Sequence, residues 1–122
     1  MCIRDSPKTL VYDLARYVNT RSPIIPERIL DKAPSAELKP DQTDQDDLPP
    51  YELLDAILKA SIEDIKTFDQ IVHMGFDPVI VRDILSRIDR NEYKRNQAAP
   101  GLKVTSKAFG YGRRYPLAKK SK

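Results

Sequence analysis

The 122-residue sequence has one cysteine, one histidine, four glycines and no tryptophan, and each shortage excludes a kind of chemistry. Cys2 alone cannot form an internal disulfide, which is typical of proteins in a reducing compartment. With His73 as the only histidine, the chain offers neither a set of zinc ligands nor a Cys/His nucleophile pair. No glycine follows an apolar strand pattern, so a glycine-rich phosphate loop is absent. We expect His73 to be a surface or helix-end residue.

Long hydrophobic runs are also missing from the sequence. No apolar stretch approaches the roughly 20 residues that a membrane-spanning helix needs, and no signal peptide is visible. We therefore expect a cytoplasmic protein with no membrane partner. The first six residues, MCIRDS, carry no pattern that continues into the rest of the chain. We interpret residues 1–6 as an unrelated leader or an assembly scar.

The charges are unevenly distributed, although the formal net charge is only +3. The acidic residues gather between positions 31 and 52, where they are Asp31, Glu37, Asp41, Asp44, Asp46, Asp47 and Glu52. No acid follows Glu92, and residues 119–122 form a basic end. This asymmetry favours contact between the C-terminal part and phosphate or another acidic surface. A solvated tail balanced by an acidic loop fits the composition equally well.

Hydrophobic periodicity predicts a mainly α-helical fold with about four to five helices. The helices are expected from residue 7 to about 20, from 26 to 30, from 50 onward, from 67 to 75 and from 78 to about 97. Ser6 is the expected N-cap of the first helix, and Thr67 with Gln70 is typical of a capping box. The last helix is expected to be the longest, with a buried stripe at Val81, Ile84, Leu85 and Ile88. Residues 31–50 should form a long acidic loop and residues 102–122 an irregular basic tail.

Lysines and hydroxyl groups are the remaining candidates for chemistry. Lys8 lies just inside a helix start, where free N–H groups and the helix dipole favour an anion, but it is equally explained as a solvated charge. Ser35 follows a proline in the acidic loop and can contact a phosphate or a metal-bound water, although such serines are common. Tyr93, Lys94 and Arg95 end the last helix, where the dipole favours cations with or without a ligand.

Three strings resemble, in chain order, the C-terminal part of bacterial glutamine-dependent NAD⁺ synthases: PKTLVYDLARYVN, IPERILDKAPSAELKPDQTDQDDLPPYELLDAIL and DRNEYKRNQAAPGLKVTSKAFGYGRRYPLA. The resemblance covers residues 7–118 and implies the C-terminal portion of a synthetase domain of the ATP-pyrophosphatase group. Such a parent domain is α/β, with a parallel sheet that is missing from this sequence. The implied reaction is that of a carbon–nitrogen ligase, which amidates deamido-NAD to NAD⁺ with ATP and glutamine-derived ammonia. It proceeds through an acyl-adenylate and releases AMP and pyrophosphate.

The resemblance also implies roles for single residues. Lys8 and Ser35 match positions that contact ATP, and Ser35 matches a possible Mg²⁺ contact within a mobile loop over residues 33–50. Tyr93 and Lys94 match positions that contact deamido-NAD, often across a subunit interface of a homo-oligomer. The residues in the tail typical of the glutamine-using enzymes are Lys103, Thr105 and Ser106.

The sequence also departs from the pattern of this family. The SGGxDS-type loop that cradles the ATP phosphates and the glutaminase domain with its cysteine are not in it. We therefore identify no catalytic residue in this sequence. We expect the fragment to be inactive alone, because it can position charge but cannot complete the transition state.

Two other functions remain open at this point. Residues 73–76, HMGF, lie between two expected helices and resemble the loop of ubiquitin-associated three-helix binding modules. Tyr111 and Tyr115 interleave with Arg113 and Arg114, a mixture that binds single-stranded nucleic acid by charge and stacking. The acidic loop would compete with nucleic acid for these cations, so we expect no nucleic-acid partner.

Overall fold

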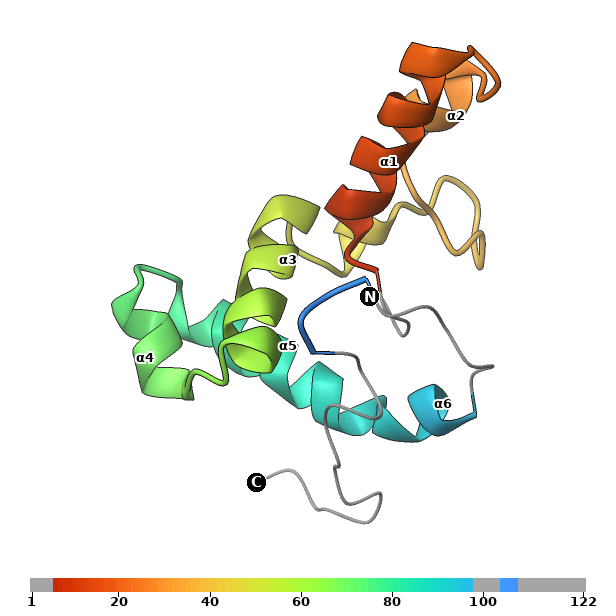
Figure 1. Cartoon of the computed structure of the whole chain (residues 1–122). Coiled ribbons are helices and arrows are strands. Elements are labelled where there is room, and N and C mark those ends of the chain that lie inside the picture. The colour runs from red at the N-terminus through yellow and green to blue at the C-terminus, as the bar shows by residue number, and fades with distance from the viewer. Residues whose placement is uncertain (1–5, 98–103, 108–122) are drawn as a thin grey trace.

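The computed structural model describes residues 6–97 and 104–107, and within them the chain forms α-helices, one 3₁₀ helix and one π-helix but no strand. The α-helices are α1 (Lys8–Arg21), α2 (Glu27–Asp31), α3 (Tyr51–Leu58), α4 (Phe68–His73), α5 (Pro78–Arg90) and α6 (Glu92–Asn96). The prediction of a mainly helical chain is confirmed. Figure 1 shows α3, α4 and α5 close together, with α1 and α2 extending away from them as an arm.

The hydrophobic core lies among α3, the π-helix (Lys59–Glu63), α4 and α5. Its members are Tyr51, Leu54, Ile57, Leu58, Ala60, Ile62, Ile71, Val81, Ile84 and Ile88. Full burial of one such aliphatic side chain stabilises a fold by about 1.5–3 kcal/mol. Three of the four residues predicted for the buried stripe of α5 belong to this core, and the fourth, Leu85, is only partly buried. Neither α1 nor α2 contributes a buried residue.

The ends of α4 and α5 are set by local hydrogen bonds. Thr67 donates its backbone N–H to Oε1 of Gln70 (2.9 Å), and its Oγ1 accepts from the N–H of Gln70 (3.4 Å), which confirms the predicted capping box. Gly75 follows α4 with φ of +97°, a backbone conformation that side chains with a Cβ rarely adopt. Asp77 then caps α5 by accepting from the N–H of Val79 (2.7 Å). His73 is exposed at the end of α4, as predicted.

The predicted helix over residues 78–97 is interrupted in the structure. It ends at Arg90, and α6 begins at Glu92. Asn91 lies between them, and its side-chain amide donates to the carbonyl oxygen of Arg87 at 2.7 Å. Asparagine often replaces backbone bonds in this way, which disfavours continuation of a helix. With 13 residues, α5 is also not the longest helix, because α1 has 14.

One further expectation for the N-terminal half is wrong. Ser6 does not cap α1, because Pro7 occupies the N-cap position and no side chain of that segment bonds the first turn. The predicted long acidic loop is confirmed, and it contains one short 3₁₀ helix, Asp44–Asp46. The N–H of Asp44 donates to the Pro34 carbonyl (2.8 Å), and the hydroxyl of Tyr51 donates to the Asp44 carboxylate. The first bond closes the loop on itself, and the second joins the loop to the start of α3.

Candidate functional site

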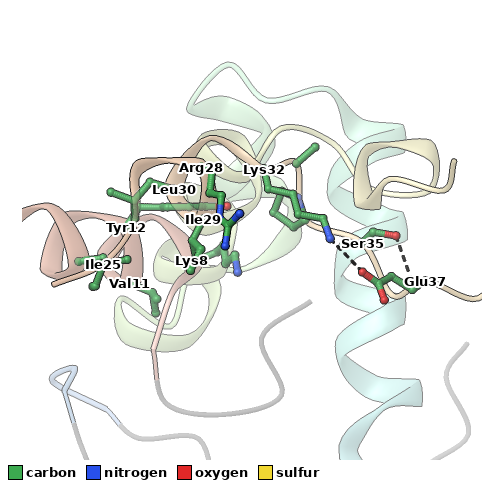
Figure 2. Close-up of a pocket in the computed structure, with 13 residues that line it drawn as sticks. Lys8, Val11, Tyr12, Ile25, Arg28, Ile29, Leu30, Lys32, Ser35 and Glu37 are labelled. Carbon is green, nitrogen blue, oxygen red and sulfur yellow. Dashed lines mark hydrogen bonds and ion pairs between the residues drawn. The ribbon is translucent and has the colours of Figure 1, made fainter.

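A cleft of about 640 Å³ lies between one side of α1 and the segment over residues 25–37. Its lining residues are Lys8, Val11, Tyr12, Ala15, Ile25, Arg28, Ile29, Leu30, Lys32, Ala33, Pro34, Ser35 and Glu37. Figure 2 shows the side chains that these two segments contribute. Lys8 and Ser35, the two residues that the sequence resemblance assigned to ATP, thus line the same cleft.

Lys8 is the first residue of α1, and its side chain is partly buried. Its Nζ lies 5.2 Å from the centre of the Tyr12 ring, one turn along the helix. A cation–π contact of this kind contributes about 0.5–1 kcal/mol at an exposed site, so it restrains the ammonium group. The ammonium group of Lys8 therefore lies beside an aromatic ring within the cleft.

The loop side of the cleft is held by hydrogen bonds around Ser35. Its Oγ accepts from the N–H of Glu37 at 3.0 Å, which forms a turn. Glu37 has a left-handed backbone (φ 52°), and its carboxylate pairs with Nζ of Lys32 at 3.1 Å. The Ser35 hydroxyl hydrogen remains able to donate, because its oxygen is the acceptor in this turn.

The cleft combines positive charge with apolar walls. Three cations, Lys8, Arg28 and Lys32, line it, whereas Glu37 is its one lining carboxylate. Within the described part of the chain, Glu37 pairs with Lys32, and neither Lys8 nor Arg28 forms an ion pair. Lysine binds phosphate as a point charge, and arginine binds it in a bidentate manner. Such a cleft can hold a polyphosphate next to a flat apolar group.

A second, smaller cleft of about 290 Å³ contains Lys94. Its lining residues are Ala36, Leu38, Gln42, Asp44, Asp47, Leu48, Arg87, Asn91 and Lys94. Tyr93 is half-exposed and not among them, although its ring centre lies 5.9 Å from Nζ of Lys94. Lys94 does not line the cleft of Lys8, but the two clefts share one loop, because Ser35 and Glu37 line the first cleft and Ala36 lines the second.

The three tail residues that the sequence resemblance singled out are Lys103, Thr105 and Ser106. Lys103 falls outside the described residues, as do Tyr111 and Arg113 of the alternative nucleic-acid site. Thr105 donates its hydroxyl to the carbonyl oxygen of Lys107 at 2.9 Å, and Ser106 donates to Glu63. Neither Thr105 nor Ser106 lines either of the two clefts.

Sequence reasoning missed three residues of the site region, namely Arg28, Lys32 and Asp55. Lys32 stands three positions before Ser35, a spacing that could have indicated a common site. Asp55 shares the spacing of the buried residues Tyr51, Leu54 and Leu58 on α3, so a charged residue occupies an apolar stripe. That mismatch is the signal by which Asp55 could have been found.

A magnesium ion in the first cleft would need oxygen ligands. Among residues 6–97 and 104–107, no three His, Cys, Asp or Glu side chains are grouped as metal ligands. The lining side chains with oxygen atoms are Tyr12, Ser35 and Glu37. Magnesium is usually bound by one or two carboxylates together with substrate phosphates and water. The cleft fits an ion that arrives with a polyphosphate.

Comparison with known proteins places the chain in a family. The model of the NAD synthase family matches residues 1–98. The chain belongs to the NAD synthase family. This confirms the resemblance that the three sequence strings indicated.

Individual relatives agree with the family match. The chain is 50% identical over 117 residues to the glutamine-dependent NAD⁺ synthetase of Acinetobacter baylyi, covering 94% of this chain and 22% of that protein. It is 52% identical over 118 residues to the glutamine-dependent NAD⁺ synthetase of Aquifex aeolicus, covering 97% and 21%. A solved structure of glutamine-dependent NAD⁺ synthetase from Acinetobacter baumannii in complex with ADP matches with a TM-score of 0.57 and 42% identity. That match covers 90% of this chain and 19% of that chain.

The fraction of each relative that the chain covers limits what can be said of its function. The chain spans about a fifth of the length of the relatives that it matches. It is therefore consistent with a fragment of a glutamine-dependent NAD⁺ synthase, a ligase. No helix within the described part of the chain is long and apolar enough to cross a lipid bilayer.

Proposed function

We propose that this chain forms part of the substrate site of a glutamine-dependent NAD⁺ synthase, with ATP bound in the cleft of Lys8 and Ser35. The complete reaction is proposed for a longer cytoplasmic enzyme in which the chain makes up about a fifth of the length. The convergence of Lys8, Arg28 and Lys32 with Ser35 in one cleft carries the proposal. It is supported by 42% identity to an enzyme whose structure was solved with ADP.

The proposed reaction explains why cations are needed at this place. A carboxylate oxygen of deamido-NAD attacks the α-phosphorus of ATP, and the bond from that phosphorus to the β-phosphate oxygen breaks. Pyrophosphate leaves with the bonding electrons, so negative charge develops on it. Ammonia then attacks the acyl carbon, AMP leaves, and loss of a proton gives the amide.

Five polar residues of the first cleft have a role in this proposal. Lys8, Arg28 and Lys32 stabilise the charge that develops on pyrophosphate. Ser35 donates its hydroxyl hydrogen to a phosphate oxygen, and the loop over residues 33–50 moves over the bound nucleotide. Mg²⁺ bound with the phosphates would neutralise part of their charge, and Ser35 and Glu37 of the first cleft would hold it.

Deamido-NAD is proposed to contact the second cleft. Lys94 lines that cleft and Tyr93 lies beside it, so a cation and an exposed aromatic ring are available to an anionic dinucleotide. Our proposal keeps the homo-oligomeric arrangement, in which this contact lies near a subunit interface. For the tail residues Lys103, Thr105 and Ser106 we propose no ligand.

Replacing Lys8 and Lys94 one at a time with alanine tests the proposal in a full-length enzyme. This chain would replace the matching segment of the Acinetobacter baylyi synthetase, to which it is 50% identical. Lys94→Ala should raise KM for deamido-NAD about tenfold or more, because a charge-assisted hydrogen bond contributes about 1.5–3 kcal/mol. KM for ATP should change less than about twofold. Lys8→Ala should show the reverse pattern.

Lys59→Ala is the matched control, because Lys59 is exposed and lines neither cleft. It should leave both Michaelis constants unchanged. If Lys8→Ala and Lys94→Ala also left both constants within about twofold, the two lysines would be surface residues and the proposed sites would be wrong.

A further inference from the structure

Asp55 is buried in a place where apolar residues are expected. It belongs to α3, whose buried stripe also contains Leu54 and Leu58, and it is only 8% exposed. Aspartate is almost never buried to this degree unless its charge is paired or hydrogen-bonded. The partners of Asp55 therefore indicate its role.

Both observed partners of Asp55 belong to one distant residue. Its Oδ2 accepts from the backbone N–H of Thr9 at 2.9 Å and from the Thr9 hydroxyl at 2.9 Å, across 46 positions of sequence. Thr9 is the second residue of α1, where backbone N–H groups have no partner inside the helix. A carboxylate is favoured there by the helix dipole. Asp55 thus caps α1 in place of the local side chain that the helix lacks.

This cap is also an attachment of the arm to the core. No residue of α1 is buried, so burial of side chains does not fix this helix. Its N-terminal end approaches α3, whereas the rest extends away from the bundle (Figure 1). The two bonds from Thr9 to Asp55 therefore restrain the end of α1 that carries Lys8.

The carboxylate at this position is only partly satisfied. Oδ1 of Asp55 is buried and has no hydrogen-bond partner within the described part of the chain. A buried oxygen without a partner is unfavourable. An apolar side chain at position 55 would avoid that cost, but it would leave the N–H and hydroxyl of Thr9 without their acceptor. The bonds to Thr9 are therefore what the carboxylate adds to the fold.

We propose that Asp55 is a positioning residue that holds the first turn of α1 through Thr9 and thereby places Lys8 in the cleft for a polyphosphate ligand. This inference rests on the proposed function, because it assigns Lys8 to ATP. A cation that is already in place loses less conformational freedom on binding than one on an unrestrained helix. Asp55 acts on the ligand only through α1.

The test measures ATP binding, in the presence of Mg²⁺, by the full-length chimeric enzyme that carries this chain, and by variants of that enzyme. Asp55→Leu should weaken ATP binding about fivefold or more, and it should also lower the melting temperature, because the N–H and hydroxyl of Thr9 lose their acceptor. Asp55→Asn keeps an oxygen acceptor for Thr9 and should bind within about twofold of the parent chain. A merely structural role would lower the melting temperature of Asp55→Leu but leave its ATP affinity, measured well below that temperature, within about twofold of the parent. Glu52→Gln, an exposed acid of the same helix, is the control and should change neither.

A double variant tests whether Asp55 acts through Lys8. Lys8→Ala combined with Asp55→Leu should bind ATP no more weakly than Lys8→Ala alone, because residues in one network are not additive. Full additivity, or unchanged affinity in Asp55→Leu when Lys8→Ala weakens binding, would overturn the inference and leave the proposed function intact.

Amide hydrogen exchange at Thr9 separates the proposed function from the anchoring if Lys8→Ala leaves ATP binding unchanged. That result would contradict the proposed role of Lys8, and the anchoring by Asp55 would then be decided by exchange alone. The Thr9 amide should exchange about tenfold or more faster in Asp55→Leu than in the parent chain. Equal exchange rates in the two proteins would overturn the anchoring.

Discussion

Ser106 donates its hydroxyl hydrogen to Oε2 of Glu63 at 2.8 Å, although the two residues are 43 positions apart. Glu63 is the last residue of the π-helix that follows α3, and Ser106 lies in the short described part of the C-terminal region. The bond brings the chain near residue 106 back to the edge of the core. Because Ser106 is exposed, the bond competes with water.

Removing this hydroxyl should have a local effect. Ser106→Ala is expected to lower the free energy of unfolding by less than about 1 kcal/mol, because an exposed neutral donor contributes little net stability. Hydrogen exchange over residues 104–107 should nevertheless become faster. Ser106→Thr keeps the hydroxyl and serves as the control. Unchanged exchange in Ser106→Ala would show that the bond does not restrain this segment.

The pKa of Asp46 should depend on Thr43. The backbone N–H of Thr43 donates to Oδ2 of Asp46 (3.1 Å) and its hydroxyl donates to Oδ1 (2.9 Å), and in that order these bonds lower the pKa of Asp46 below the ordinary value of 3.8. Thr43→Ala keeps the backbone bond and loses the hydroxyl bond. The pKa should therefore rise part of the way towards 3.8, as measured by NMR titration of the carboxyl carbon.

The same bonds predict the direction of a pH effect on the 3₁₀ helix. A carboxyl group whose pKa is lower in the folded state stabilises that state above its unfolded pKa. The contribution is lost as the pH falls below 3.8 and through the lowered pKa, so the local structure at Asp44–Asp46 should loosen in that acidic range and not above it. Chemical shifts of residues 43–47 followed from neutral pH downward would check this. A change near pH 6 would contradict the assignment to Asp46.

Replacing Ile65 with glycine should stabilise the protein. Ile65 has φ of 54°, in the left-handed region where a residue with a Cβ is strained by about 1–2 kcal/mol. Its side chain is 66% exposed, so little burial is lost in Ile65→Gly. Glycine also gives the unfolded chain more freedom, so the net gain should be about 0.5–1 kcal/mol in urea denaturation. Ile24 is 69% exposed and does not share this conformation, and Ile24→Gly should bring no gain.

Two leucines of different burial should respond differently to the same change. Leu54 of α3 is 1% exposed, and Leu54→Ala should lower the free energy of unfolding by about 2–5 kcal/mol through lost burial and a cavity. Leu14 of α1 is 50% exposed, and Leu14→Ala should cost less than about 1 kcal/mol. Thermal or urea denaturation of both variants provides the comparison. Similar losses in the two variants would mean that α1 belongs to the stabilising core.

Features that depend on neighbouring residues could be predicted from the sequence. The capping box of Thr67 and Gln70 and the Asp77–Pro78 start of α5 each involve residues within three positions of one another. The buried stripe of α5 follows from helical spacing alone. The break at Asn91 was not predicted, because apolar periodicity does not report on one side-chain amide that bonds a carbonyl oxygen.

Lys8, Ser35 and Lys94 could be selected one by one from the sequence strings, because those strings resemble a family. The sequence by itself thus determined the helical segments and their local caps, since these depend on bonds within a few residues. Only the tertiary structure brought Lys8 and Ser35 to one cleft with Arg28 and Lys32, placed Lys94 in another, and joined Asp55 to Thr9 across 46 positions. Those relationships arise from packing α3, α4 and α5 into one core and from the direction in which α1 leaves it. No spacing along the chain encodes that direction, because it is set by contacts between residues far apart in sequence.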